Sequence, residues 1–291
     1  MSDQKAERSV LGTPAEADVL DATNEGSSVT SDIAAPVSIS DYVALTKPRL
    51  TLLSVMTTLA GYWFATSGQV DLLHLLQTLA ATFLVGGGCG ALNMVLETEH
   101  DRRMHRTQER PTARGVISQG RGTAVGLILV GSGLLWLAVA TNLMAVIVAA
   151  ATFVSYVFVY TPLKRISTIN TIIGAFPGAL PPLIGWAAAS GGISAGGIAL
   201  FALVFFWQMP HFLALAWMYR IDYERAGFRM LPIVDPGGDA TARQILVYAT
   251  ALLPVSLIPV FAGLTGPVFF FGALALGLVF IAAGFLFLQK R

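Results

Sequence analysis

The hydrophobic positions of this chain fall into eight long runs separated by polar connections of alternating length. A helix that crosses a bilayer needs roughly 17–25 predominantly apolar residues, and each run is long enough. The runs predict membrane helices over residues 50–68, 73–96, 122–141, 143–160, 168–188, 195–217, 245–264 and 267–288. The expected fold is therefore an all-α, polytopic transmembrane helical bundle.

The connections between these runs differ sharply in charge. The four short ones contain a single acid, Asp71, and no Lys or Arg; they lie near 69–72, 141–143, 189–194 and 264–267. All 18 Lys and Arg residues consequently fall on one side of the membrane in this assignment. Because cytoplasmic loops carry an excess of basic residues, both chain ends are predicted to be cytoplasmic. We expect a multi-pass protein of the bacterial inner membrane.

Composition excludes a soluble globular protein. Hydrophobic residues make up 55% of the chain and charged residues only 12%, against about 25% charged in an average domain. Residues 1–41 contain eight acids and two basic residues, and we expect this polar leader to be disordered and cytoplasmic. Residues 42–291 form the predicted membrane domain. Its one cysteine, Cys89, lies in an apolar run and is expected to be a structural thiol.

The densest polar chemistry lies in residues 93–111, NMVLETEHDRRMHRTQERP, where the second apolar run ends. Asn93, Glu97 and Asp101 recur at a spacing of four, which on a helix places all three on one face. Such oxygen ligands suit Mg²⁺, and the arginines that follow, such as Arg102 and Arg106, suit phosphate. Asn93 also lies inside the apolar run, where a polar side chain needs a partner.

Two further charged clusters are predicted at the same membrane edge. The first, residues 160–165 (YTPLKR), contributes Lys164 and Arg165. The second follows Gln208 and His211 within residues 207–232 and includes Arg220, Asp222 and Tyr223. Asp222 is positioned to supply a carboxylate across the bundle from Asp101. Three such helix ends on one face favour a site that handles an anion together with a metal.

These groups suggest a reaction class. A diphosphate bound by Mg²⁺ and basic side chains becomes a good leaving group, because its developing charge is stabilised in advance. If the rest of the substrate is a hydrocarbon chain, ionisation gives an allylic cation that aromatic rings stabilise and that must be kept from water. No protein nucleophile is needed for such a reaction.

Glycine and proline are concentrated in two segments, residues 86–90 (GGGCG) and 174–185 (GAFPGALPPLIG). Small residues allow helices to pack closely in lipid, which is the simpler interpretation. The three prolines of the second segment, Pro177, Pro181 and Pro182, additionally free backbone carbonyls that protein or a wet cavity must satisfy. A kinked helix that lines a pocket is the alternative interpretation.

The motif at Asn93, Glu97 and Asp101 resembles the N-x-x-x-D/E-x-x-x-D signature of the UbiA-type intramembrane prenyltransferases. Three longer blocks resemble, within that family, the heme O synthases (protoheme IX farnesyltransferases). The blocks are EHDRRMHRTQERPTARG, YTPLKRISTINTIIGAFPGALPPLIGWAA and WQMPHFLALAWMYRIDYERAGFRMLP. Together the resemblance covers roughly residues 40–288.

This resemblance implies transfer of a farnesyl group from farnesyl diphosphate to a vinyl group of protoheme IX (heme B), which yields heme O. Mg²⁺ is the implied cofactor. The implied partners are the two substrates and membrane lipid, with possible hand-over to heme A synthase or terminal oxidase assembly and without nucleic acid. The implied roles are catalysis and metal binding for Asn93, Glu97, Asp101 and Asp222, diphosphate binding for Arg102, Arg106, Lys164, Arg165 and Arg220, and acceptor binding for His211, Tyr160 and Tyr223.

The chain departs from the family pattern at two places. The second acidic motif of the superfamily is D-x-x-x-D, but residue 226, four after Asp222, is Ala226. This substitution leaves open whether one or two Mg²⁺ ions bind. The family also usually has nine membrane helices, whereas eight are predicted here.

Two other functions fit parts of the same pattern. A UbiA-type prenyltransferase with an aromatic or quinone-precursor acceptor would share the diphosphate site. A transporter or heme-binding membrane protein would fit the Pro/Gly segment, since transporters use broken helices. The concentration of charge at one membrane edge favours an enzyme with its site at that edge.

Overall fold

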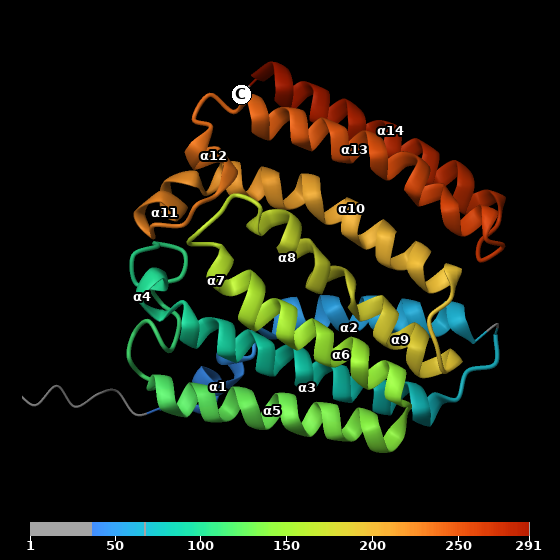
Figure 1. The fold of residues 1–291 in the computed structure, drawn as a ribbon, viewed down its shortest axis with the longest axis horizontal. Coiled ribbons are helices and arrows are strands. Elements are labelled where there is room, and N and C mark those ends of the chain that lie inside the picture. Colours follow the sequence, from blue (N-terminus) through green and yellow to red (C-terminus); the bar gives the residue numbers. More distant parts are fainter. Residues whose placement is uncertain (1–36, 67, 291) are drawn as a thin grey trace, which may run out of the picture. The chain divides into compact units, whose positions relative to one another are not determined.

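The computed structural model describes residues 37–66 and 68–290, and in this part of the chain all regular structure is helical. Eight helical passages run back and forth through the bundle in Figure 1. They are α2 (Pro48–Ala65), α3 (Leu72–Leu96), α5 (Gln119–Ala140), α6 (Leu143–Val154) with the π-helix η1 (Ser155–Tyr160) and α7 (Thr161–Leu163), α8 (Asn170–Ala179) with α9 (Pro181–Ser190), α10 (Ala195–Met218), α13 (Asp239–Phe261) and α14 (Pro267–Lys290). The predicted all-α membrane bundle is confirmed.

Seven of these passages are long and apolar enough to cross a membrane. The exception among the described residues is α2, which is 18 residues long and includes Arg49 and several hydroxyl side chains. Several predicted boundaries also shift by a few residues, and two of these shifts add polar residues to a predicted run. The seventh run begins at Asp239 rather than 245, and the fourth continues through η1 to Leu163 rather than ending at 160. Both extensions carry polar residues that a hydrophobic pattern does not include.

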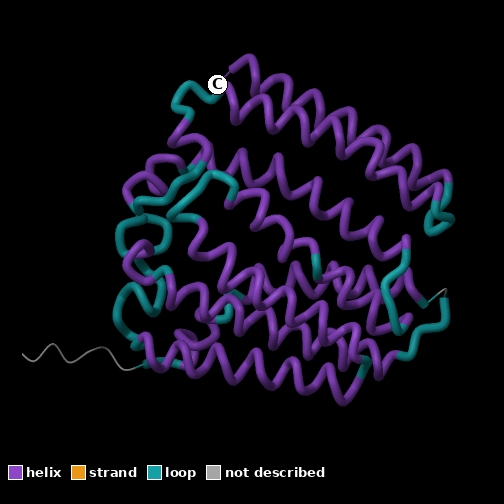
Figure 2. The backbone as a smooth tube through the Cα atoms, viewed as in Figure 1, coloured by secondary structure: helices purple, strands orange, loops and turns teal. Residues whose placement is uncertain are grey.

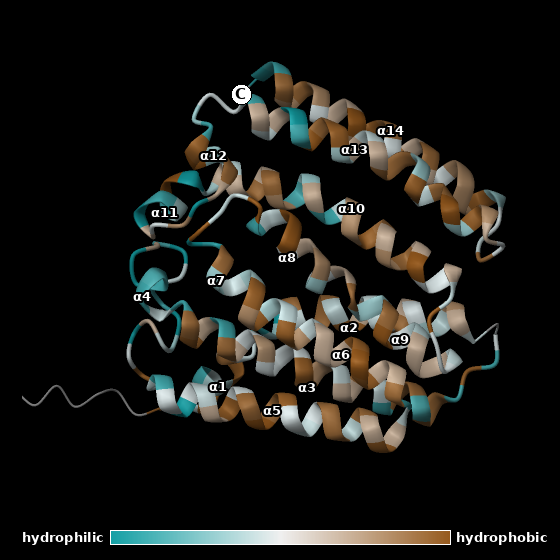
Figure 3. Cartoon of the chain, in the orientation of Figure 1, coloured by the Kyte–Doolittle hydropathy of each residue, from teal (hydrophilic) through white to brown (hydrophobic). Residues whose placement is uncertain are grey.

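The longer polar connections gather at one end of the bundle. This end holds α4 (Thr98–Asp101), α7, α11 (Arg220–Arg225) and α12 (Leu231–Val234), on the left in Figure 1. Figure 2 shows most of the loop there, and the same end is the most hydrophilic part of Figure 3. The charge clusters predicted to share one membrane edge therefore do share it. That this edge is cytoplasmic stays a prediction.

The chain enters the bundle through α1 (Ile39–Leu45), which begins within the segment predicted as a disordered leader. Ser38 and Asp41 form a reciprocal capping box, with the Asp41 backbone N–H bound to the Ser38 hydroxyl and the Ser38 N–H bound to the Asp41 carboxylate. Such a box satisfies N–H groups that a helix start otherwise leaves free. Residues 37–41 are therefore ordered as a helix start, and the remainder of the predicted leader lies outside the described residues.

Glycines set the closest helix contacts. Gly88 and Gly126 let α3 and α5 approach until a Cβ on either would collide with the other helix. Gly61 on α2 and Gly185 on α9 do the same for a second pair, since a Cβ on Gly185 would overlap the backbone carbonyl of Thr58. The packing interpretation of the Gly-rich segments is thus correct at these positions.

The proline segment breaks its helix at Leu180, between α8 and α9. The carbonyl of Pro181 accepts a hydrogen bond from the Thr58 hydroxyl at 3.0 Å. Residues 181–188 are all buried, and α9 packs along α2. The Thr58 bond and the burial of residues 181–188 show that the segment after the break packs closely against α2.

We expect Gly185→Ala to destabilise the bundle by about 1–3 kcal/mol, because overpacking forces the α2 and α9 backbones apart. The measurement is the thermal unfolding midpoint in detergent. Gly131→Ala on α5 is the matched control, since a Cβ there meets no atom within 4 Å. Equal losses for the two variants would contradict the proposed contact.

Candidate functional site

The trio Asn93, Glu97 and Asp101 lies on one helical path at the end of α3. The N–H of Glu97 donates to the carbonyl of Asn93 at 3.0 Å, and the N–H of Asp101 donates to that of Glu97 at 2.8 Å. The spacing of four is therefore helical through the change from α3 to α4. The three residues are only 1%, 3% and 0% exposed. Such burial excludes the interpretation that they are ordinary water-facing residues of a helix end.

Asn93 is held from both sides of its amide. Its oxygen accepts a hydrogen bond from the ammonium group of Lys47, at the junction of α1 and α2. Its nitrogen donates to the hydroxyl of Thr161 on α7 at 2.9 Å. One buried polar side chain thus joins three segments that are far apart in the sequence.

Lys47 reaches this position because the chain turns sharply before α2. Its φ of +49° is the only positive value outside glycine in the described residues. Gly87 and Gly90 on α3 leave room for the turn, since a Cβ on Gly90 would lie 3.2 Å from the carbonyl oxygen of Thr46. The glycine-rich segment therefore brings a lysine to the site.

Glu97 pairs with Lys164, which follows directly after α7. The lysine Nζ lies 2.7 Å from the carboxylate, and the two side chains are only 12% and 4% exposed. The same ammonium group lies 4.5 Å from the centre of the Tyr160 ring, the last residue of η1. π-Helical turns inside α-helices occur frequently at functional sites, and here one immediately precedes Thr161 and Lys164.

Asp101 is bound by Arg110 from the loop that leads to α5. One guanidinium nitrogen donates to both carboxylate oxygens, at 2.8 and 2.7 Å. Thr107, from the same loop, donates its hydroxyl to the Asp101 carbonyl at 3.0 Å. The loop is therefore folded around the last residue of the trio.

These charges perturb one another. Burial of the Lys47 ammonium group, together with the charge of Arg110, lowers the pKa of this lysine to about 7. Burial would raise the pKa of Glu97, but the charges of Lys164 and Lys47 outweigh it and hold this pKa below its usual value. Burial would lower the pKa of Lys164, but attraction to Glu97 raises it. The site thus favours ionised Glu97 and protonated Lys164 as a pair.

The donor set of the trio fits magnesium. It offers one amide oxygen and two carboxylates, and Mg²⁺ is usually bound through one or two carboxylates together with water and substrate phosphates. No group of three or more His, Cys, Asp and Glu side chains in the described part of the chain is arranged to enclose a metal ion alone. A magnesium ion here would therefore depend on oxygens that a phosphate substrate brings.

Three of the predicted phosphate-binding arginines are engaged elsewhere. Arg102 donates to the carbonyl of Ala113 and to Glu99, and Arg165 donates to the carbonyl of Leu96 at 2.6 Å. Arg220 bonds the Trp217 carbonyl and lies over the Trp217 ring. All three are at the correct end of the bundle, but none contacts the trio.

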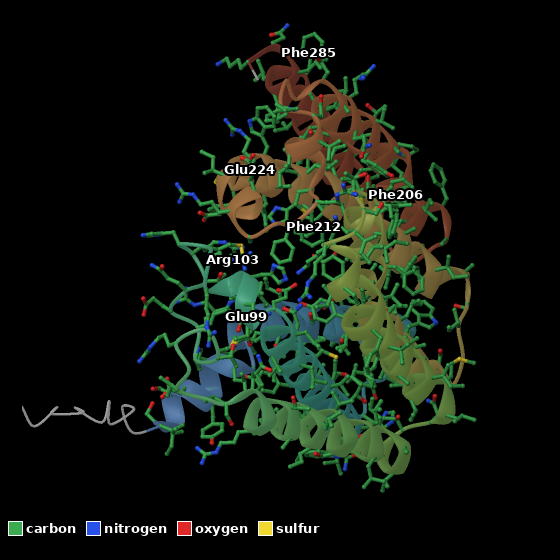
Figure 4. The ribbon with its side chains drawn as sticks, turned by 60° about the vertical axis from the view of Figure 1, so that its left-hand side comes forward. Glu99, Arg103, Phe206, Phe212, Glu224 and Phe285 are labelled. Atoms are coloured by element: carbon green, nitrogen blue, oxygen red, sulfur yellow. The ribbon has the colours of Figure 1, made fainter. Side chains whose placement is uncertain are left out.

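Arg106 connects the loop after α4 to the segment around α11 (Arg220–Arg225). Its guanidinium carbon lies 5.0 Å from the centre of the Tyr219 ring, and one nitrogen lies 3.5 Å from the Tyr223 hydroxyl. Figure 4 shows neighbouring side chains from the same two segments, Glu99 and Arg103 near α4 and Glu224 on α11, at this end.

The remaining predicted residues lie away from the trio. His211 stacks on Trp207, with ring centres 5.3 Å apart, on an exposed part of α10. Ala216 of the same helix packs with Met104 from the loop after Asp101. Five helical residues correspond to a rotation of about 140°, so His211 points away from that loop. Asp222 is half-buried, and its carboxylate has no hydrogen bond or ion pair with a described residue.

The sequence interpretation assigned no role to Lys47 and did not select Arg110 as a site residue, although both contact the trio closely. Arg110 was visible as one of several arginines after Asp101, but spacing did not distinguish it from Arg102. Lys47 precedes Pro48 at the start of the first predicted helix. In the sequence, Lys47 is recognisable only as a basic residue at the predicted membrane edge, and the other Lys and Arg residues share this feature.

Comparison with known proteins places these residues in a family context. The sequence model of the UbiA prenyltransferase family matches residues 54–291. The protoheme IX farnesyltransferase of Solibacter usitatus is 46% identical over 253 residues, which cover 84% of this chain and 87% of that protein. The protoheme IX farnesyltransferase of Koribacter versatilis is 45% identical over 86% of this chain and 84% of its own length.

Solved structures of similar fold support the arrangement of helices. A digeranylgeranylglyceryl phosphate synthase has a TM-score of 0.72 at 19% identity, covering 86% of this chain and 88% of its own. A UbiA homolog from Archaeoglobus fulgidus bound to GPP and Mg²⁺ has a TM-score of 0.64 at 15% identity, covering 86% of both chains. At this identity the likeness concerns the fold alone.

We expect Lys164→Met to destabilise the protein by about 3–5 kcal/mol, because it leaves the buried Glu97 carboxylate unpaired. The measurement is unfolding of the purified protein in mixed micelles. Glu99→Gln is the control, since it breaks the exposed Glu99–Arg102 pair and is expected to cost at most about 1 kcal/mol. Adding Glu97→Gln to Lys164→Met should recover part of the loss. No recovery would argue against an unpaired charge as the cause.

Proposed function

Since this chain belongs to the UbiA prenyltransferase family and, within it, to the protoheme IX farnesyltransferases, we propose that it transfers the farnesyl group of farnesyl diphosphate to a vinyl group of heme B. The product is heme O. The observation that carries this proposal is the buried cluster around Asn93, Glu97 and Asp101, where oxygen ligands and three cations meet at the end of an apolar bundle.

The chain's own cations are suited to the diphosphate. Lys47, Lys164 and Arg110 converge on the trio from three different segments. We propose that these three side chains bind diphosphate oxygens, with Arg106 at the mouth of the site. Asn93, Glu97 and Asp101 would hold Mg²⁺ against the same oxygens. When bound, the metal stabilises negative charge on the leaving diphosphate.

The reaction then requires no protein nucleophile. The bond between the first farnesyl carbon and the diphosphate oxygen breaks, and the diphosphate leaves with the electron pair. Lys47, Lys164 and Arg110 stabilise that charge, since donors fixed in advance need no rearrangement as it develops. The vinyl carbon of heme forms the new carbon–carbon bond, and water adds to the resulting cation, gives the hydroxyl group and releases a proton.

Aromatic side chains lie close to the proposed leaving group. Tyr160 lies beside Lys164, and its ring is 5.5 Å from that of Tyr156. Electron-rich ring faces attract cations, so these tyrosines are suited to stabilising the allylic cation. For the acceptor we propose contacts with Tyr160 and Tyr223. His211 is the weaker candidate because it faces away from the loop after Asp101.

This chain is a multi-pass membrane protein, and a substrate with a long hydrocarbon chain suits such a bundle. We propose that it lies in the bacterial inner membrane with the charged end in the cytoplasm, because that end holds the basic residues. Hand-over of the product to heme A synthase or to terminal oxidase assembly is a further part of the proposal.

The decisive experiment incubates the purified protein with heme B, farnesyl diphosphate and Mg²⁺ and identifies the product by mass. We expect a heme whose mass has increased by one farnesyl group and one hydroxyl group. A parallel reaction offers an aromatic quinone precursor as the acceptor. Prenylation of that acceptor alone would refute the heme assignment and retain the prenyltransferase class.

Asp101→Asn is expected to reduce turnover by at least about 100-fold, because it removes a carboxylate charge from the proposed metal site. Turnover is measured as product formed per minute. Glu99→Gln, an exposed acid two residues away, is the matched control and should retain near-normal turnover. Near-normal heme O formation by Asp101→Asn would contradict the role in metal binding.

A further inference from the structure

We infer that this chain binds its prenyl diphosphate with one divalent cation, and that Lys47, Lys164 and Arg110 supply the positive charge that a second cation would bring. This inference rests on the proposed function and specifies the metal content of the same site. Two observations support it. Ala226 stands where the second acid of the D-x-x-x-D motif would be, four residues after Asp222, and the charges around the trio balance with a single divalent ion.

The position four residues after Asp222 is closed to a metal ligand. Ala226 is 0% exposed and packs in an apolar cluster with Met104, Phe228 and Met230. Its carbonyl oxygen lies 2.6 Å from Nδ1 of His100, whose ring stacks on Phe228. The Ala226 side chain therefore offers only an apolar surface to an ion, and the Ala226 carbonyl oxygen already contacts His100.

Asp222 remains as the only acid of that motif. A two-metal site holds its ions about 3.5–4 Å apart, so the protein ligands of a second ion must lie close to those of the first. Asp222 is half-buried on α11 and bonds neither the trio nor its cations. The next acid, Glu224, is exposed. The segment around α11 thus contributes a single carboxylate, and no contact with a described residue places it beside the trio.

The charges around the trio balance with one ion. Glu97 and Asp101 contribute two negative charges, and Lys164 and Arg110 contribute two positive ones. Lys47, which burial leaves only partly charged near pH 7, contributes a third when a diphosphate beside it favours the protonated form. One divalent cation raises the surplus from one positive charge to three. An alkyl diphosphate carries about three negative charges near pH 7, because its last ionisation lies near pH 6. A second divalent cation would leave the buried site positively charged, which burial disfavours.

The inference is tested by counting metal ions. Mn²⁺ is titrated into the detergent-purified full chain with a thiodiphosphate analogue of farnesyl diphosphate that does not ionise, and free Mn²⁺ is followed by its electron paramagnetic resonance signal. We expect one Mn²⁺ bound per chain, with a single-site binding curve. Two bound ions would overturn the one-cation inference and leave the proposed function standing. No bound ion would overturn both.

Three variants assign the ion to its ligands, and circular dichroism in detergent first confirms that each keeps its helical fold. Asp101→Asn should lose the bound Mn²⁺, with affinity falling by about 10–100-fold or more. Asp222→Asn should retain one ion per chain with affinity within about threefold of the parent, as should the exposed control Glu99→Gln. Loss of the ion in Asp222→Asn, or its retention at parental affinity in Asp101→Asn, would contradict the assignment.

Discussion

The site depends on one constraint, which is that charged and amide groups buried at the end of an apolar bundle must each find a partner. Isolated buried charges cost several kcal/mol even after relaxation, so the trio at the end of α3 is stable only when others meet it. Asn93 is met by Lys47 and Thr161, Glu97 by Lys164 and Asp101 by Arg110. Those partners come from the α1–α2 junction, from α7 and from the loop before α5. The same contacts that satisfy the charges therefore assemble the site.

Backbone features elsewhere in the bundle allow these side chains to contact the trio. Gly87 and Gly90 leave room for the turn that carries Lys47, and Lys47 itself adopts a positive φ within that turn. On the opposite side, the π-helical turn of η1 delivers Thr161 and Lys164. Small residues in α3 and an irregular turn in the fourth passage are thus parts of the site, although neither carries its chemistry.

Much of the fold was predictable, since hydrophobic runs reflect burial in lipid and their number and order follow directly. The helical spacing of Asn93, Glu97 and Asp101 was predictable for the same reason, because four residues nearly complete a helical turn. The partners were not. Lys47 and Arg110 are ordinary basic residues in sequence, and only tertiary structure distinguishes them from Arg102 and Arg165, which bond backbone carbonyls. His211 was attractive as a polar residue in an apolar run, but hydropathy does not record which side of α10 it faces.

The pairing of every trio residue has a consequence for how a substrate is admitted. A free diphosphate that took Lys164 and Arg110 would leave Glu97 and Asp101 as bare buried anions. A free metal ion that took the carboxylates would strand the ammonium and guanidinium groups against it. Only a ligand that brings both signs of charge together can exchange partners with the whole cluster at once. If the proposed substrate binds here, the internal ion pairs would therefore favour the metal–diphosphate complex over either the metal ion or the diphosphate alone.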